Sequence, residues 1–451
     1  MSEMRAYFES GVTRPAAFRK EQLRKLKAAI VLRESALLSA LHEDLGKSPE
    51  EAYVTEIGQV LHEISYALRH LDSWMKPERI PTPLAYFPSR STILKEPLGI
   101  VLIIAPWNYP LMLLLSPLVG AIAAGNCMVC KPSEHAPATS AALASLLGDT
   151  FPSSFIQVLE GDGAEVIPAL LALERPDHIL FTGSIPVGRE ILKLAAPGLV
   201  PVTLELGGKS PAIVDGTADL GVTARRIVQG KFINAGQTCV APDYLLVHAS
   251  LREQLIEALR AAIVDFFGEN PAASPDYGRI INAGRFRKLK GFLSAGRIIQ
   301  GGQTDEQALY IAPTLLDEVP ADSPIMQEEI FGPLLPIMTF EDREELSTMI
   351  GRHPQPLALY VFSEDRRWVE ELVRSISFGG GCINNTLVHF GNPALPVGGI
   401  GYSGMGRYHG RESFRTFSHL KSVTRSGTWI DTKVKYPPYK GKMKIFRFFF
   451  R

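Results

Sequence analysis

The chain has 451 residues, and its 47 basic and 47 acidic side chains leave no net charge at pH 7. This balance gives no support for nucleic acid or an anionic surface as a partner of the whole chain. Its four cysteines are too few for the disulfide framework of a small secreted domain, so we expect reduced thiols. The length and a hydrophobic content of 46% predict about two or three domains.

Residues 1–33 are charged throughout and lack the apolar run and cleavage site of a signal peptide, which predicts a cytoplasmic protein. Between residues 20 and 76, apolar positions recur at helical spacing. They predict an opening pair of helices, ended by a group of prolines from Pro77 to Pro88.

The segment from Pro97 to Cys130 carries no charged residue, which on hydropathy alone could indicate a membrane span. Prolines and Asn108 interrupt it, however, and an unbroken apolar helix is what lipid requires. We therefore predict a buried strand (GIVLIIA), a turn (PWNYP) and a buried helix (LMLLLSPLVGAIAAG).

Short Val/Ile/Leu runs then alternate with helical patterns: GIVLII, NCMVCKP, FIQVLEG, HILFTG, PVTLELGG and PAIVDG. Such alternation is typical of βαβ units on a mostly parallel sheet that is buried on both faces. A second series begins near Gly207, so two α/β domains are predicted with a boundary there.

One cysteine, Cys239, lies in the polar stretch NAGQTCVAPDY. A cysteine attacks as its thiolate, and a free thiol with a pKa of about 8.5 is mostly protonated at neutral pH. Gly236 allows the backbone to turn just before Cys239, which could present the thiol beside free amide groups. The other three cysteines read as small hydrophobic residues, and no cluster has the spacing of a metal site.

Other candidate residues follow predicted strands. Glu205 ends the strand of TLELGGKSP and could act as a general base, and Asn108 of PWNYP could donate to a developing oxyanion. In HILFTGSIPVG, Gly183, Ser184 and Gly188 enter a helix whose free N–H groups could face a pyrophosphate. An ordinary βα turn explains that spacing equally well.

Taken together, these stretches resemble the aldehyde dehydrogenase superfamily, and most closely its class 3 branch, which includes the fatty aldehyde dehydrogenases. The shared motifs occur in family order from about residue 20 to about residue 438: PWNYP, KPSE, FTGSxxVG, LELGGKSP, GQTCVAPDY, EEIFGPLLP and LPVGGIGYSGMGRYHG.

The resemblance implies an α/β fold with a Rossmann-like NAD-binding domain (1–79 and 97–207) and a second α/β catalytic domain (208–403). A small bridging or oligomerisation element, with the C-terminal tail, would comprise residues 80–96 and 404–451.

The implied activity is NAD(P)-dependent oxidation of aldehydes to carboxylic acids. Cys239 would attack the aldehyde to give a thiohemiacetal, while Asn108 and the Cys239 backbone N–H hold the oxyanion and hydride passes to the nicotinamide. Glu205 would activate the water that hydrolyses the resulting thioester. A covalent intermediate of this kind separates oxidation from hydrolysis.

The family pattern also implies a set of cofactor-binding residues at the adenosine ribose, the pyrophosphate and the nicotinamide ribose. They are, in that order, Lys131 and Glu134; Gly183, Ser184 and Gly188; and Glu329 and Phe331. A carboxylate near the ribose 2′-OH would repel a 2′-phosphate, so NAD is predicted as the cofactor, with NADP also accepted. Ile185 and Pro186 depart from the usual family motif.

Class 3 analogy and the apolar neighbours Tyr109 and Met112 favour medium or long aliphatic, or aromatic, aldehydes as substrates. Tyr408 and His409 could line the same entrance, although packing explains either equally well. The alternatives are a CoA-acylating relative, which a water-activating Glu205 argues against, a cysteine hydrolase, and a non-catalytic binding or structural relative.

Class 3 relatives imply a homodimer. The tail VKYPPYKGKMKIFRFFFR mixes basic and aromatic residues, a composition suited to peripheral contact with a membrane. A disordered end, or a strand added to a partner subunit, is an equally good interpretation of the tail.

Overall fold

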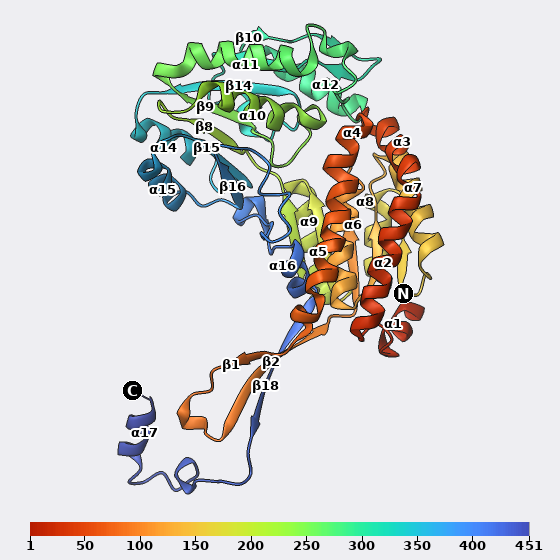
Figure 1. The fold of residues 1–451 in the computed structure, drawn as a ribbon, viewed down its shortest axis with the longest axis vertical. Coiled ribbons are helices and arrows are strands. Elements are labelled where there is room, and N and C mark those ends of the chain that lie inside the picture. Colours follow the sequence, from red (N-terminus) through yellow and green to blue (C-terminus); the bar gives the residue numbers. More distant parts are fainter. Residues whose placement is uncertain (451) are drawn as a thin grey trace.

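A computed structural model describes residues 1–450 as two α/β bodies with a narrow arm extending from them (Figure 1). The first body is built on a six-stranded sheet with the order β17-β7-β6-β3-β4-β5. Its strands are β3 (Ile100–Ile104), β4 (Cys127–Lys131), β5 (Ile156–Val158), β6 (His178–Gly183), β7 (Val202–Leu206) and β17 (Gly404–Met405). All of these pairings are parallel except that between β17 and β7.

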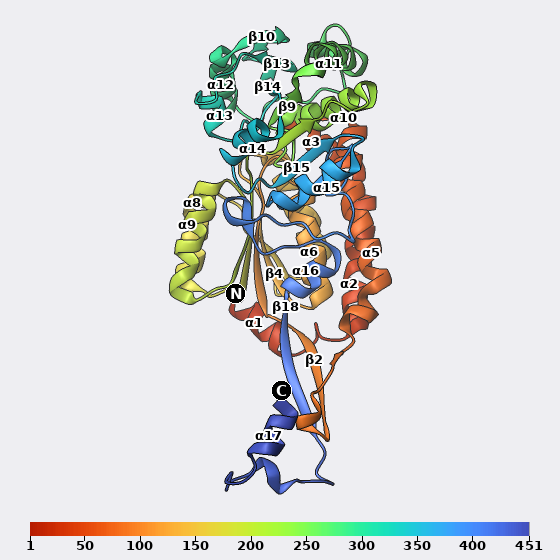
Figure 2. The same cartoon turned by 90° about the vertical axis from the view of Figure 1, so that its left-hand side faces the viewer.

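Helices cover both faces of this sheet. Figure 2 shows α8 (Gly163–Leu173) and α9 (Ile185–Ala195) on one side, with α2 (Ala16–Leu32), α5 (Gly58–Met75) and α6 (Met112–Ala124) on the other. The remaining helices of this body are α1 (Ser2–Glu9), α3 (Glu34–Leu45), α4 (Pro49–Ala52), α7 (Pro137–Thr150) and α16 (Gly410–Thr416).

The expected opening pair of helices is wrong, because three long helices, α2, α3 and α5, fill that region. The chain bends at Arg33 (φ −106°, ψ 13°) without a proline or glycine to mark the break. The apolar spacing continues across this bend, since Leu26, Ile30 and Leu37 are all buried in one core. Periodicity alone therefore could not separate α2 from α3.

The charge-free segment folds as the sequence predicts. Every residue of β3 and of α6 is buried, and the two elements are joined by the PWNYP turn. Helix α6 has 13 residues and carries Pro117 in its interior. Within residues 1–450, no helix is both long enough and apolar enough to cross a membrane.

The second body contains a seven-stranded sheet with the order β10-β13-β14-β9-β8-β15-β16. These strands are β8 (Pro211–Val214), β9 (Tyr244–His248), β10 (Arg297–Gln300), β13 (Thr314–Asp317), β14 (Leu334–Phe340), β15 (Ala358–Phe362) and β16 (Gly380–Ile383). A short hairpin and six helices complete the body: β11 (Thr304–Asp305), β12 (Tyr310–Ile311), α10 (Leu220–Phe232), α11 (Arg252–Phe267), α12 (Ala283–Phe292), α13 (Pro324–Gln327), α14 (Arg343–Gly351) and α15 (Arg366–Ser375).

Two separate hydrophobic cores divide the chain between Leu206 and Ala212. Residues 404–417, which we expected in the bridging element, instead return to the first body. Gly404 pairs with Glu205, and Phe414 and Phe417 are buried in the first core. The expectation failed because nothing local in a glycine-rich stretch reveals this long-range pairing.

The arm is a three-stranded antiparallel sheet of β1 (Glu78–Ile80), β2 (Ser89–Pro97) and β18 (Ser418–Ser426). Strand β18 pairs with β2 on one side only, and within residues 1–450 its other edge pairs with no strand. The tail ends in a short helix, α17 (Met443–Phe450), at the far end of the arm (Figure 1). There the ring of Phe450 lies 6.5 Å from that of Tyr86.

Candidate active site

A cavity of about 730 Å³ opens where the carboxyl ends of β3, β6 and β7 face the second body. The carboxyl ends of parallel strands meet at one edge of a sheet, which is where ligands bind in such folds. Seven of the residues selected from the sequence line this cavity: Asn108, Gly183, Ser184, Glu205, Cys239, Glu329 and Phe331.

A second cavity, of about 490 Å³, reaches Cys239 from another direction. Most of its lining is apolar or aromatic, and includes Tyr109, Met112, Leu387 and Phe390. Cys239 is the residue that lines both cavities. The sulfur-bearing residue therefore stands at the junction of a polar cleft and an apolar channel.

The backbone before Cys239 is held in an unusual conformation. Asn234, Ala235 and Gly236 are consecutive residues with φ values of 54°, 50° and 74°. A Cβ atom on Gly236 would lie 2.3 Å from the carbonyl oxygen of Gly332, so only glycine fits there. Left-handed conformations at non-glycine residues are costly and cluster at functional sites, where surrounding structure holds them.

Burial raises the pKa of the Cys239 thiol to about 12, and the carboxyl groups of Glu329 and Glu205 add to this increase. The backbone N–H groups of Cys239 and Val240 act in the opposite direction, because they stabilise the thiolate. In this state of the site the group is a protonated thiol. Nucleophilic attack therefore requires its proton to be removed.

Glu205 is the second-to-last residue of strand β7 and is 4% exposed. Its Oε1 atom has no hydrogen-bond partner among residues 1–450. Burial raises the pKa of this carboxyl well above its ordinary value. When it is ionised, a carboxylate shifted in this way is a stronger base than a solvated one.

Asn108 is 2% exposed and follows β3 in the PWNYP turn. Its Nδ2 donates to the carbonyl oxygen of Gln237 at 3.0 Å, which fixes the amide against the Cys239 loop. An amide NH₂ carries two hydrogens, so one remains available for an oxyanion in the cleft.

The start of α9 has the features of an anion site. Ser184 is its N-cap and makes no side-chain capping bond, so the first N–H groups of the helix are free to bind a ligand. Gly183 leaves room for the Phe181 ring, which a Cβ would approach to 2.5 Å. Gly188 does not line the cavity; a Cβ there would lie 2.8 Å from Leu206, which indicates that it allows α9 to pack on the sheet.

Lys131 and Glu134 also do not line the cleft. They lie at the end of β4 and pair with each other at 2.8 Å. Glu134 additionally accepts the N–H of Gly163 at 3.2 Å, which connects it to the start of α8.

The structure separates the four predicted substrate residues. Tyr109 and Met112 line the apolar channel. His409 and Met112 line a small side chamber of about 10 Å³ next to it. Tyr408 lines none of these three cavities and is 1% exposed, with its backbone bridged to Val397, so it packs in the core.

Sequence reasoning missed several residues of the cleft. Arg285 donates to the carbonyl oxygens of Ile330 and Phe331, and its guanidinium lies 5.9 Å from the Phe331 ring centre. Lys209 is buried in an ion pair with Asp243. Lys209 belongs to the motif LELGGKSP and could have been selected, whereas Arg285 stands in no motif that we recognised.

The profile of the aldehyde dehydrogenase family matches residues 1–423. The chain belongs to the aldehyde dehydrogenase family. This aldehyde dehydrogenase is 50% identical over 451 residues to the 4,4′-diaponeurosporen-aldehyde dehydrogenase of Staphylococcus aureus (strain NCTC 8325 / PS 47), covering 100% of the chain and 98% of the relative. It is 44% identical to aldehyde dehydrogenase family 3 member H1 of Arabidopsis thaliana, covering 99% and 93%.

Among solved structures, the substrate-bound state of Staphylococcus aureus AldH superimposes with a TM-score of 0.97 at 50% identity, covering 100% of the chain and 98% of that structure. An indole-3-acetaldehyde dehydrogenase complexed with NAD+ has a TM-score of 0.86 at 28% identity, covering 94% and 88%. These matches confirm the predicted α/β fold, with its Rossmann-like and catalytic domains, and the resemblance to class 3. Members of the family oxidise aldehydes to carboxylic acids, and this chain is an oxidoreductase acting on the aldehyde group.

Proposed function

We propose that this enzyme oxidises apolar, medium-chain or long-chain aldehydes to carboxylic acids, with NAD as the cofactor and NADP also accepted. One observation carries the proposal: Cys239 lies where the polar cleft and the apolar channel meet. An aldehyde in the channel and a nicotinamide in the cleft would thus approach one sulfur from two sides.

The residues of the cleft fit a dinucleotide. The uncapped N-terminus of α9 suits a pyrophosphate, and Glu329 and Phe331 line the part of the cleft that also contains Cys239. Gly207 permits Glu329 to reach this place, since a Cβ there would lie 1.8 Å from the Glu329 carboxyl oxygen. When bound, the nicotinamide ring supplies the hydride acceptor. Lys131 and Glu134 are proposed to hold the adenosine ribose from the adjoining strand end.

Different side chains of the protein carry out the separate steps of the reaction. Cys239 releases its proton to water and its sulfur adds to the carbonyl carbon, while the second Asn108 N–H and the Cys239 N–H stabilise the oxyanion. Loss of a hydride from this adduct to the bound nicotinamide would leave the thioester. Glu205, lying at the same cleft, removes a proton from the water that attacks the thioester. Its raised pKa suits this work.

The apolar lining of the channel supports the substrate class. Val54, Met112, Leu113, Ile233 and Phe390 are among its walls. Their contact with an aliphatic or aromatic tail removes apolar surface from water, which favours binding by about 25 cal/mol per Å².

The test is a panel of aldehydes of increasing chain length, measured by the absorbance of the reduced cofactor with NAD and with NADP. We expect Cys239→Ala to abolish NADH production while NAD binding and the melting temperature stay near those of the wild type. We expect Glu205→Gln to give one rapid burst of NADH and then stall, because the thioester is no longer hydrolysed. Normal turnover by Cys239→Ala, or steady turnover without a burst by Glu205→Gln, would refute the corresponding role.

We also propose a homodimer, formed through the arm. In the described part of the chain, strand β18 presents an unpaired edge of nine residues, with Leu420 and Val423 more than one-third exposed. An unpaired strand edge presents a row of backbone N–H and C=O groups that can pair with another strand. A second copy of the chain is the partner that this edge would meet first.

We further propose a cytoplasmic enzyme whose arm tip touches membranes. The last turn of the tail exposes Phe448 and Phe450, at 78% and 67%, and basic residues lie between the aromatic ones. Such a surface suits the interface of an anionic bilayer. The full chain should sediment with phosphatidylserine vesicles at low salt and a variant lacking residues 440–451 should not; equal sedimentation of the two would contradict this proposal.

A further inference from the structure

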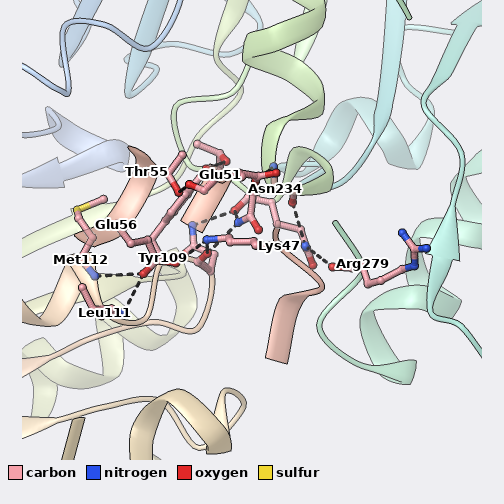
Figure 3. A network of polar contacts seen from close by, with 12 residues as sticks. Lys47, Glu51, Thr55, Glu56, Tyr109, Leu111, Met112, Asn234 and Arg279 are labelled. Carbon is pink, nitrogen blue, oxygen red and sulfur yellow. Dashed lines mark hydrogen bonds and ion pairs between the residues drawn. The ribbon is translucent and has the colours of Figure 1, made fainter. Parts of the chain in front are cut away.

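Lys47 and Glu56 form an ion pair of 2.5 Å in which both side chains have no solvent exposure. Figure 3 shows the pair in a polar network between the first helices and the Cys239 loop. Neither residue lines the cleft, the channel or the side chamber, so neither can touch a substrate there. The network nevertheless connects them to the atoms that are proposed to react.

The Glu56 carboxylate caps the start of α6. Its Oε1 accepts from Lys47, and its Oε2 accepts the backbone N–H groups of Leu111 at 2.9 Å and Met112 at 3.2 Å. The first N–H groups of a helix lack partners within the helix, and a carboxylate there is favoured by the helix dipole. Glu56 therefore fixes where α6 begins, directly after the PWNYP turn.

The Lys47 ammonium holds the other end of the same turn. It donates to the carbonyl oxygen of Asn108 at 3.2 Å and lies 4.1 Å from the centre of the Tyr109 ring. The ion pair thus makes three hydrogen bonds to the backbone of residues 108–112 and contacts one side-chain ring, that of Tyr109. Any shift of the pair moves the peptide that carries the Asn108 amide.

Three hydrogen bonds then join this turn to the loop of the second body that carries Cys239. The Asn234 Nδ2 donates to the Asn108 carbonyl oxygen at 2.8 Å, and the Asn108 Nδ2 donates to the Gln237 carbonyl oxygen at 3.0 Å. The Tyr109 and Thr238 hydroxyls lie 2.6 Å apart. The Asn108 amide and the sulfur therefore belong to one network, and Lys47 and Glu56 support it from behind.

We propose that Lys47 and Glu56 are positioning residues that set the Asn108 amide against the Cys239 sulfur, so that the amide meets the oxyanion formed there. The inference depends on the proposed function of Asn108 and Cys239. Folding stability alone does not demand this pair, since a buried ion pair can be replaced by neutral groups of similar shape at little cost or even with a gain. The ion pair instead contributes to the position of the Asn108 amide in the transition state, where a small displacement of a hydrogen-bond donor lowers the rate strongly.

The experiment compares Glu56→Gln, the double variant Lys47→Met/Glu56→Gln, and the control Asp177→Asn. The control has similar contacts at a less buried place: Asp177, with a side chain 19% exposed, pairs with a basic residue, Arg5, at 2.6 Å and accepts the backbone N–H of Ile100 at 2.8 Å. It does so at the amino end of β3, whereas Asn108 follows the carboxyl end. The readouts are kcat, the KM for aldehyde and for NAD, the rate of the first hydride transfer, and the melting temperature.

Glu56→Gln leaves Lys47 as an unpaired buried charge, so we expect both a lower melting temperature and a kcat reduced by roughly 10-fold to 100-fold. The KM values should stay within about twofold, because neither residue lines a cavity. The double variant removes both charges and should recover the melting temperature but not kcat or the first hydride transfer. Asp177→Asn should lower the melting temperature while kcat stays within about twofold.

Recovery of wild-type kcat in the double variant would overturn the positioning role and leave the pair purely structural. A loss of kcat in Glu56→Gln no larger than that in Asp177→Asn would do the same. Failure of the proposed function is a separate result, because it would appear as a wild-type chain that makes no NADH from any aldehyde in the panel.

Discussion

At the scale of single residues, the Cys239 thiol is the most informative group. Burial and two nearby carboxyl groups raise its pKa to about 12, while two backbone amides favour the thiolate. Without a ligand in the cleft, the thiol should therefore be slow to react at neutral pH, in contrast to cysteines that are activated in the free enzyme.

This pKa predicts the pH dependence of alkylation. Below the pKa, the thiolate fraction rises about tenfold for each pH unit, so the rate of reaction of Cys239 with iodoacetamide in the cofactor-free enzyme should keep rising from pH 7 to pH 10. Mass spectrometry of the peptide containing Cys239 separates it from Cys382, which is also half-buried. A rate that levels off below pH 8 would show that the thiol is already activated in the free enzyme.

The chemistry-bearing residues were also the part of the site most accessible to prediction. Cys239, Glu205 and Asn108 stand in short motifs, and each lies at a strand end or after a glycine turn, so their convergence on one cleft could be expected. The supporting residues could not. Glu56 meets Leu111 across 55 residues, and nothing in the composition around either of them signals a buried contact.

At the scale of elements, the left-handed stretch of Asn234, Ala235 and Gly236 decides how the nucleophile loop leaves α10. Hydrogen bonds to residues of both bodies keep this stretch in its strained conformation. The Asn234 N–H donates to Glu51 at 2.8 Å, and the Gln237 Nε2 donates to the carbonyl of Arg279 at 2.9 Å (Figure 3). The loop can thus be strained and still be rigid.

Gly236→Ala should disrupt this loop. The new Cβ would lie 2.3 Å from the Gly332 carbonyl oxygen, in addition to the cost of about 1–2 kcal/mol for a left-handed alanine. We expect kcat to fall by more than about tenfold, because a misplaced nucleophile loses its alignment.

Gly268→Ala is the control for backbone strain without a clash, since Gly268 has φ 75° and ψ 177°, a backbone region that essentially only glycine adopts, and no atom lies within 4 Å of its Cβ position. It should show only the cost of placing an alanine in this glycine-type backbone conformation, seen as a lower melting temperature, with kcat unchanged. Equal effects of the two substitutions on kcat would mean that the contact with Gly332 is unimportant.

Secondary structure was predictable where one element is buried on all sides, as in the charge-free β3 and α6. Secondary structure was not predictable where contacts between distant parts of the sequence determine it. The bend at Arg33 and the return of β17 to Glu205 have no local marker, because each is fixed by packing between segments far apart in sequence.

At the scale of the whole molecule, the arm is the part of the chain that packs least against the rest of the protein. It has its own short sheet, it lies apart from both cores, and β18 has one free edge (Figure 1). The proposed dimer would bury this edge.

The charge variant Val423→Lys tests that arrangement. Val423 is 38% exposed on β18, and placing a lysine at a covered strand edge should weaken association by at least about tenfold, equivalent to about 1.4 kcal/mol. Leu173→Lys is the control, because Leu173 is 84% exposed at the end of α8, on the main body of the chain. Light scattering should show a dimer for the wild type and the control and a larger monomer fraction for Val423→Lys; identical masses for all three would exclude β18 from the interface.

The two cavities that share Cys239 have separate openings, and this affects how large a molecule the enzyme can process. Val54 and Val388, which line the apolar channel, are 58% and 57% exposed, so the channel reaches the surface at its rim. The aldehyde group of a long substrate can therefore enter the channel while the far end of its hydrocarbon tail stays in solvent. The tail then does not block the exchange of oxidised for reduced dinucleotide in the cleft. Such an enzyme has no strict upper bound on tail length, only a minimum reach needed to bring the head group to the sulfur.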